Sequence, residues 1–82
     1  MFVLYHRVAD PECAAIRALI VEAGLKAQVD FQNVDTDGAE AFAARGGTAV
    51  PALWDGERLH VGAGAIRRAL GGIIPADARR AP

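Results

Sequence analysis

Breaks rich in glycine, proline and aspartate divide this 82-residue chain into seven short segments. The order of those segments constrains the fold more than any other feature. Apolar or alternating runs predict strands, and apolar residues at helical spacing predict helices. The predicted strands are residues 2–6, 29–34, 51–54 and 58–61, and the predicted helices are residues 11–23, 39–45 and 62–70. The order is therefore β-α-β-α-β-β-α.

That order predicts an α/β fold with a four-stranded mixed sheet. The first β-α-β unit is expected to form a right-handed parallel crossover, and the step Asp55-Gly56 predicts an antiparallel hairpin. Because the strands are apolar rather than cleanly alternating, helices are expected on both faces, in a three-layer α/β/α arrangement. Alternation along the hairpin predicts two faces: Leu53, Leu59 and Val61 on one, Trp54 and His60 on the other.

The first helix has clear signals at both ends. Asp10 is a side-chain acceptor suited to the N-cap, and Pro11 suits the first helical position. Gly24 follows the last turn, where a glycine commonly ends a helix. We therefore expect a helix that begins at Pro11 and ends just before Gly24.

The size and composition of the chain exclude several classes of protein. A chain of this length supports one domain, predicted at residues 1–71, with a flexible tail at residues 72–82. A single cysteine permits no internal disulfide, and the absence of serine excludes a serine nucleophile. One cysteine and two histidines cannot form the usual structural zinc sites, and no metal site is predicted.

Charge and hydropathy indicate the kinds of partner and the cellular location that we expect for the protein. A formal net charge of −1 argues against a nucleic-acid partner, which usually requires a basic face. No apolar run approaches the roughly 18 residues needed to cross a bilayer, so no membrane association is expected. The start of the chain lacks a charged leader and a cleavage site, and we predict a cytoplasmic location.

The order of elements and several short motifs resemble the thioredoxin fold in its glutaredoxin form, over residues 1–71. The stretch from Tyr5 to Cys13 aligns without a gap with the family's strand end and its Cys-Pro-Tyr-Cys motif. Residues 48–51, Thr-Ala-Val-Pro, are similar to the Thr-Val-Pro signature, which implies a cis Val50–Pro51 peptide bond. From Pro51 onward, the chain also resembles the N-terminal domain of glutathione transferases.

The chain departs from the family pattern at the positions that carry the chemistry. The attacking cysteine of glutaredoxins is replaced by Asp10, and the only thiol, Cys13, occupies the second cysteine position. The side chains that hold the free amino acid end of glutathione are replaced by small residues, Gly62-Ala63 or Gly64-Ala65. The resemblance leaves four candidate ligand contacts: Arg7, Pro11, Val50 and Pro51.

Asp10 and Cys13 are the candidate catalytic residues, and each has a structural alternative. Asp10 would act as a base or a fixed anion, whereas a helix N-cap already explains an aspartate there. Cys13 would act alone, through a mixed disulfide with glutathione or with a partner's thiol, whereas a lone cysteine is more often a small buried hydrophobe. Arg7 would bind an anion, or pair with Asp10 or Glu12 at the surface.

Two functions from different classes follow. The first is a glutaredoxin-like protein linked to thiol redox or glutathione chemistry, with its dithiol activity absent or reduced. As an enzyme it would be a monothiol thiol-disulfide oxidoreductase that uses Cys13. The second is a thioredoxin-fold binding or interaction module without catalysis. No cofactor is implied beyond glutathione as a ligand, and a homodimer is left open.

Overall fold

The computed structural model describes residues 2–72 and contains the seven predicted elements in the predicted order. Each lies within one residue of its predicted bounds, and a short 3-10 helix, η1, was not predicted. Apart from Gly72, the predicted tail lies outside the described residues. The elements are β1 (Phe2–His6), α1 (Pro11–Glu22), η1 (Lys26–Gln28), β2 (Val29–Asn33), α2 (Ala39–Ala44), β3 (Ala52–Trp54), β4 (Leu59–Val61) and α3 (Ala63–Gly71).

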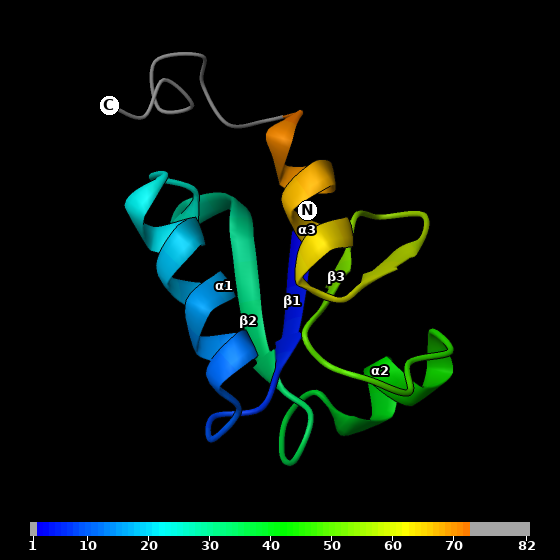
Figure 1. Cartoon of the computed structure of the whole chain (residues 1–82). Helices are drawn as coiled ribbons and strands as arrows, with labels where there is room; N and C mark the ends of the chain where they lie inside the picture. Colours follow the sequence, from blue (N-terminus) through cyan, green and yellow to red (C-terminus); the bar gives the residue numbers. More distant parts are fainter. Residues whose placement is uncertain (1, 73–82) are drawn as a thin grey trace.

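The four strands form one mixed sheet in the order β2-β1-β3-β4 (Figure 1). Strand β1 pairs with β2 in parallel, with Phe2 opposite Val29. It pairs with β3 in the antiparallel direction, with Tyr5 opposite Ala52. Strand β4 pairs with β3, also antiparallel. The predicted mixed sheet is confirmed, with β1 and β3 at its centre and β2 and β4 at its edges.

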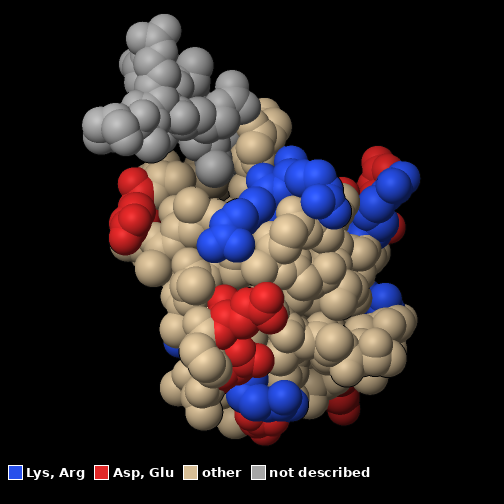
Figure 2. Space-filling view, viewed as in Figure 1, with Lys and Arg blue, Asp and Glu red and all other residues tan. Residues whose placement is uncertain are grey.

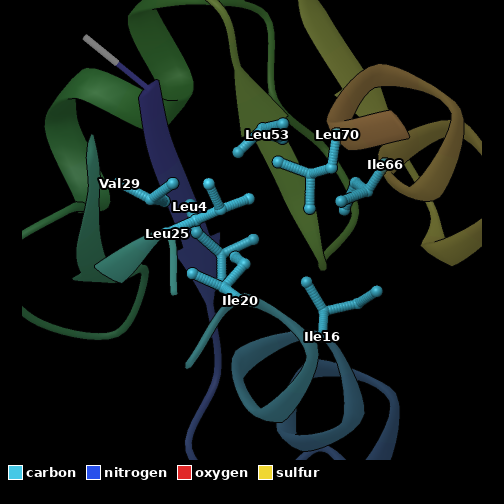
Figure 3. Close-up of a cluster of buried hydrophobic side chains, with 8 residues drawn as sticks. All are labelled: Leu4, Ile16, Ile20, Leu25, Val29, Leu53, Ile66 and Leu70. Carbon is cyan, nitrogen blue, oxygen red and sulfur yellow. The ribbon is translucent and has the colours of Figure 1, made fainter. Parts of the chain in front are cut away.

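Helices α1 and α3 lie side by side on one face of the sheet and enclose the larger core (Figures 1 and 3). Ile16 and Ile20 are four residues apart on α1, as Ile66 and Leu70 are on α3, so each pair faces the sheet. No member of this core is more than 3% exposed: Leu4, Ile16, Ile20, Leu25, Val29, Leu53, Ile66 and Leu70.

Helix α2 covers the opposite face of the sheet, over a smaller apolar cluster. Val3, Tyr5 and Ala52 are the buried members of that cluster, and Phe42 of α2 packs against them. Side chains alternate along a strand, so β1 presents Leu4 to the first core and Tyr5 to the second. Helices therefore cover both faces, and β1 is buried on both sides.

The end of α1 shows how the chain turns back toward the sheet. The C-cap is Ala23, and Gly24 follows it with a φ of +74°, one residue beyond the cap. The N–H of Leu25 donates to the carbonyl of Ile20 at 2.9 Å, and both side chains belong to the larger core. This closure satisfies a carbonyl of the last turn and carries the chain from helix to sheet.

The β3–β4 hairpin differs from the prediction in which side chains share a face. Leu53 lies opposite His60, and Trp54 lies opposite Leu59. Because opposite residues of antiparallel strands share a face, Leu59 and Val61 lie on the side of Trp54, and the prediction was wrong. A connection of four residues after Trp54 sets this register, and the turn signal alone does not reveal its length.

Candidate functional site

The carboxyl end of β1 is the candidate site. Neighbouring strands β1 and β2 are parallel and lead to helices on opposite faces, and open α/β sheets bind ligands at such a point. Antiparallel β3 begins at the same edge, because its first residue, Ala52, lies opposite Tyr5 near the end of β1. The structure thus brings together, at one end of the sheet, the candidates Arg7, Asp10, Pro11, Cys13, Val50 and Pro51.

Asp10 is the N-cap of α1. One carboxylate oxygen accepts hydrogen bonds from the N–H groups of Glu12, at 2.8 Å, and Cys13, at 3.3 Å. These bonds satisfy two of the free donors in the first turn, and the negative charge lies at the positive end of the helix dipole. The capping interpretation is confirmed, and the oxygen that carries it faces the helix rather than a ligand.

Cys13 is fully buried in the first turn of α1. Its Sγ accepts a hydrogen bond from the backbone N–H of Arg7 at 3.4 Å. Burial raises the pKa of the Cys13 thiol, and the Arg7 N–H opposes that rise only in part. Because the thiolate is the reactive form, this environment favours the unreactive thiol at neutral pH.

Arg7 pairs with Asp35, which follows β2 at the same edge of the sheet. Its Nε lies 3.2 and 3.1 Å from the two carboxylate oxygens of Asp35. Of the two interpretations of Arg7, the surface ion pair is found, but its partner is Asp35 rather than Asp10 or Glu12, because β2 runs parallel to β1 and delivers Asp35 to this end. Both side chains are about half exposed, at 51% and 52%, so the pair contributes little stability and an anionic ligand can compete for Arg7.

Val50 and Pro51 enter the site from the start of β3, and the peptide bond between them is cis. Pro51 is buried, and its carbonyl accepts the N–H of Gly62 at 2.9 Å, which ties it to the start of α3. Within residues 2–72, neither the N–H nor the carbonyl of Val50 has a hydrogen-bond partner. Val50 therefore offers a free donor and acceptor just before β3.

His6 and Arg17 form a polar contact at this edge that the sequence interpretation missed. Arg17 Nη1 lies 3.0 Å from His6 Nδ1. The same guanidinium donates to the carbonyls of Arg7 and Val8, each at 3.4 Å. One side chain of α1 therefore holds the whole loop between β1 and α1 in place.

The protonation of His6 follows from its surroundings. Burial lowers the pKa of His6, the Arg17 charge lowers it further, and Asp37 opposes the change. A neutral imidazole can accept the Arg17 N–H at Nδ1, which a protonated ring could not. Helical spacing could have revealed the contact, because Arg17 follows Cys13 by four residues and so faces the same loop.

Asp55 and His60 form a second unpredicted pair, in the β3–β4 hairpin. One Asp55 oxygen accepts the N–H groups of Glu57 and Arg58, both at 2.8 Å, and the other lies 2.8 Å from His60 Nε2. These hydrogen bonds, first that from the Arg58 N–H, hold the pKa of Asp55 well below its usual range. The pair braces the turn and fixes the hairpin register.

The surface seen in Figure 2 carries both signs of charge, with basic side chains gathered over α3 and acidic and basic groups mixed toward the opposite end. Among residues 2–72, no group of three or more potential ligands is arranged to hold a metal ion. No helix in the described part of the chain is both long and apolar enough to cross a bilayer.

No family model matches the chain, and no curated protein matches it significantly.

Proposed function

We propose that this chain is a glutaredoxin-like, thioredoxin-fold protein that has lost dithiol chemistry and retains a binding function. The observation that carries the proposal is the Cys13 thiol, which is fully buried and hydrogen-bonded to the Arg7 N–H. A thiol enclosed in this way is a poor nucleophile. The position of the family's attacking cysteine is held by Asp10, whose carboxylate is engaged in the helix cap.

The sheet supports the thioredoxin-like part of the proposal. The strand order β2-β1-β3-β4, with one parallel pair and helices on both faces, agrees with the order of motifs along the chain. A shared fold does not fix a function, so the binding function depends on the site itself.

The ligand class that we propose is an extended peptide backbone, with glutathione as its smallest example. Val50 offers an N–H and a carbonyl that such a backbone can pair with, and Arg7 offers a half-exposed guanidinium to a carboxylate. The start of α3, Gly62 to Ala65, lacks side chains that could hold the free amino acid end of glutathione. We therefore expect weak binding of glutathione that depends on its carboxylates.

An NMR titration of the protein with reduced glutathione tests this proposal. We expect shifts of the Val50 amide and its neighbours, and weaker binding by Arg7→Gln, by several-fold, since exposed ion pairs contribute about 0.2–1 kcal/mol. The matched control is Arg67→Gln on the exposed face of α3, which should bind as the unaltered protein does. Shifts spread evenly over the surface, or none at Val50, would contradict the proposal.

A monothiol oxidoreductase that uses Cys13 is the second candidate. The Arg7 N–H that donates to Sγ favours it, because this bond stabilises the thiolate. In its first step, the Cys13 thiolate would attack oxidised glutathione, form a mixed disulfide and release one glutathione thiolate. Mass spectrometry after incubation with oxidised glutathione separates the two candidates: the binding module stays unmodified while folded, whereas the monothiol enzyme gains one glutathione.

A further inference from the structure

Helix α2 is attached to the rest of the molecule by few contacts. It has six residues, Ala39–Ala44, and none of them is buried. Its N-cap is Gly38, which supplies no capping side chain. A helix this short is not stable by itself in water, so its contacts with the sheet must hold it in place.

Arg45, directly after α2, makes the strongest of those contacts. Its Nη1 donates to the hydroxyl of Tyr5 at 2.6 Å. Its guanidinium carbon lies 4.4 Å from the centre of the Trp54 ring and 5.9 Å from that of Tyr5. One exposed cation therefore links the end of α2 to both central strands, β1 and β3.

Phe42 packs against the sheet together with Ala41, and the position of its ring depends on a glycine. Its ring centre lies 5.2 Å from that of Tyr5. The ring lies against Gly47, where any side chain would overlap it. Phe42 remains partly exposed, so it stabilises α2 less than a core side chain would.

Glycines flank the helix on both sides, and the two have different surroundings. Gly38 lies against β2, where a Cβ would come within 2.9 Å of the Gln32 Cβ. Gly46 has a φ of +81°, a conformation that other residues rarely adopt. Gly46 therefore gives the chain a point at which it can bend, whereas Gly38, whose N–H donates to the Asn33 carbonyl at 2.8 Å, holds the start of the segment against β2.

We propose that residues 38–47 form a hinged cover over the second face of the sheet, and that Arg45 is its latch. When the latch is released, the cover moves away while the α1–α3 face stays folded, and Tyr5 and Trp54 become accessible. The chain between Arg45 and Val50 moves with it. The contacts that carry this proposal do not involve Val50, so the opening can be tested whether or not Val50 binds a ligand, and it would control access to that residue.

Native-state hydrogen exchange measured by NMR tests the latch. The informative amides are those of Phe42, Arg45 and Gly46, which donate to carbonyls within or beside α2. In the unaltered protein they should exchange faster than core amides such as that of Leu25. In Arg45→Ala they should exchange about tenfold faster still, because a charged hydrogen bond and a cation–π contact are lost, while core amides keep their rates.

Two further variants make the result decisive. Arg45→Lys keeps the charge but loses the planar guanidinium, and should accelerate exchange by less than Arg45→Ala does. Arg68→Ala, on α3, is the matched control and should leave the α2 amides unchanged. The proposal is overturned if the α2 amides exchange only with the core amides, or if Arg45→Ala accelerates both sets equally.

Discussion

The two faces of the sheet share strand β1 but are held together in different ways. On the α1–α3 face, eight apolar side chains are at most 3% exposed, and two helices and three strands contribute to them. On the α2 face the buried cluster consists of Val3, Tyr5 and Ala52, and none of the residues of α2 is buried. There an aromatic pair and one cation take the place of a deep core.

The difference follows from the amino acids of the helices. Alanine favours a helix but adds little volume to a core, and α2 contains four alanines and one large side chain, Phe42. Helix α1 carries isoleucine at helical spacing, so it buries a continuous stripe against the sheet. The stability of the α1–α3 face therefore comes from buried apolar area, whereas that of the α2 face comes from a few specific contacts.

The difference in stability between the two faces is tested most directly by truncating one large side chain on each face. Ile20→Ala should lower the free energy of unfolding by about 2–5 kcal/mol, because it leaves a cavity in a close-packed core. Phe42→Ala should cost less, since the ring is partly exposed and the cover can collapse over the gap. Urea denaturation of both variants measures the difference, and equal losses would show that the faces are equally important.

A methyl group added beside Phe42 tests whether the α2 face can adjust to a new side chain, and the expected effect is smaller. The new Cβ in Gly47→Ala must displace the Phe42 ring, and overpacking of a core costs about 1–3 kcal/mol. Because this ring is at the surface and can move, we expect a loss near the lower end of that range. Gly71→Ala is the control, since a Cβ there meets no atom of residues 2–72 within 4 Å. A loss in both variants would point to a backbone effect rather than to the ring.

The local signals of the sequence predicted the elements, and their order predicted the mixed sheet. Asp10 followed by Pro11 placed the start of α1 because a cap depends on neighbouring residues only. The hairpin faces were predicted wrongly, since register depends on the whole connection between the strands. The contacts of Arg45 with Tyr5 and of Arg7 with Asp35 join residues 40 and 28 positions apart, and no local pattern encodes such a pairing.

Acid should lower the free energy of unfolding through His6, which lies on the α1–α3 side of the sheet. Of the three stability effects predicted here, this is the smallest. Burial, followed by the Arg17 charge, lowers the pKa of His6 from its ordinary value of 6.5, so between these two values the unfolded chain binds more protons than the folded one. The stability that the neutral ring contributes is complete above pH 6.5 and is lost as the pH falls through the lowered pKa. Urea denaturation at pH 7.5 and pH 5 should show a larger loss for the unaltered protein than for His6→Gln, which keeps an acceptor for Arg17 but does not titrate. Equal losses would mean that His6 does not govern the acid response.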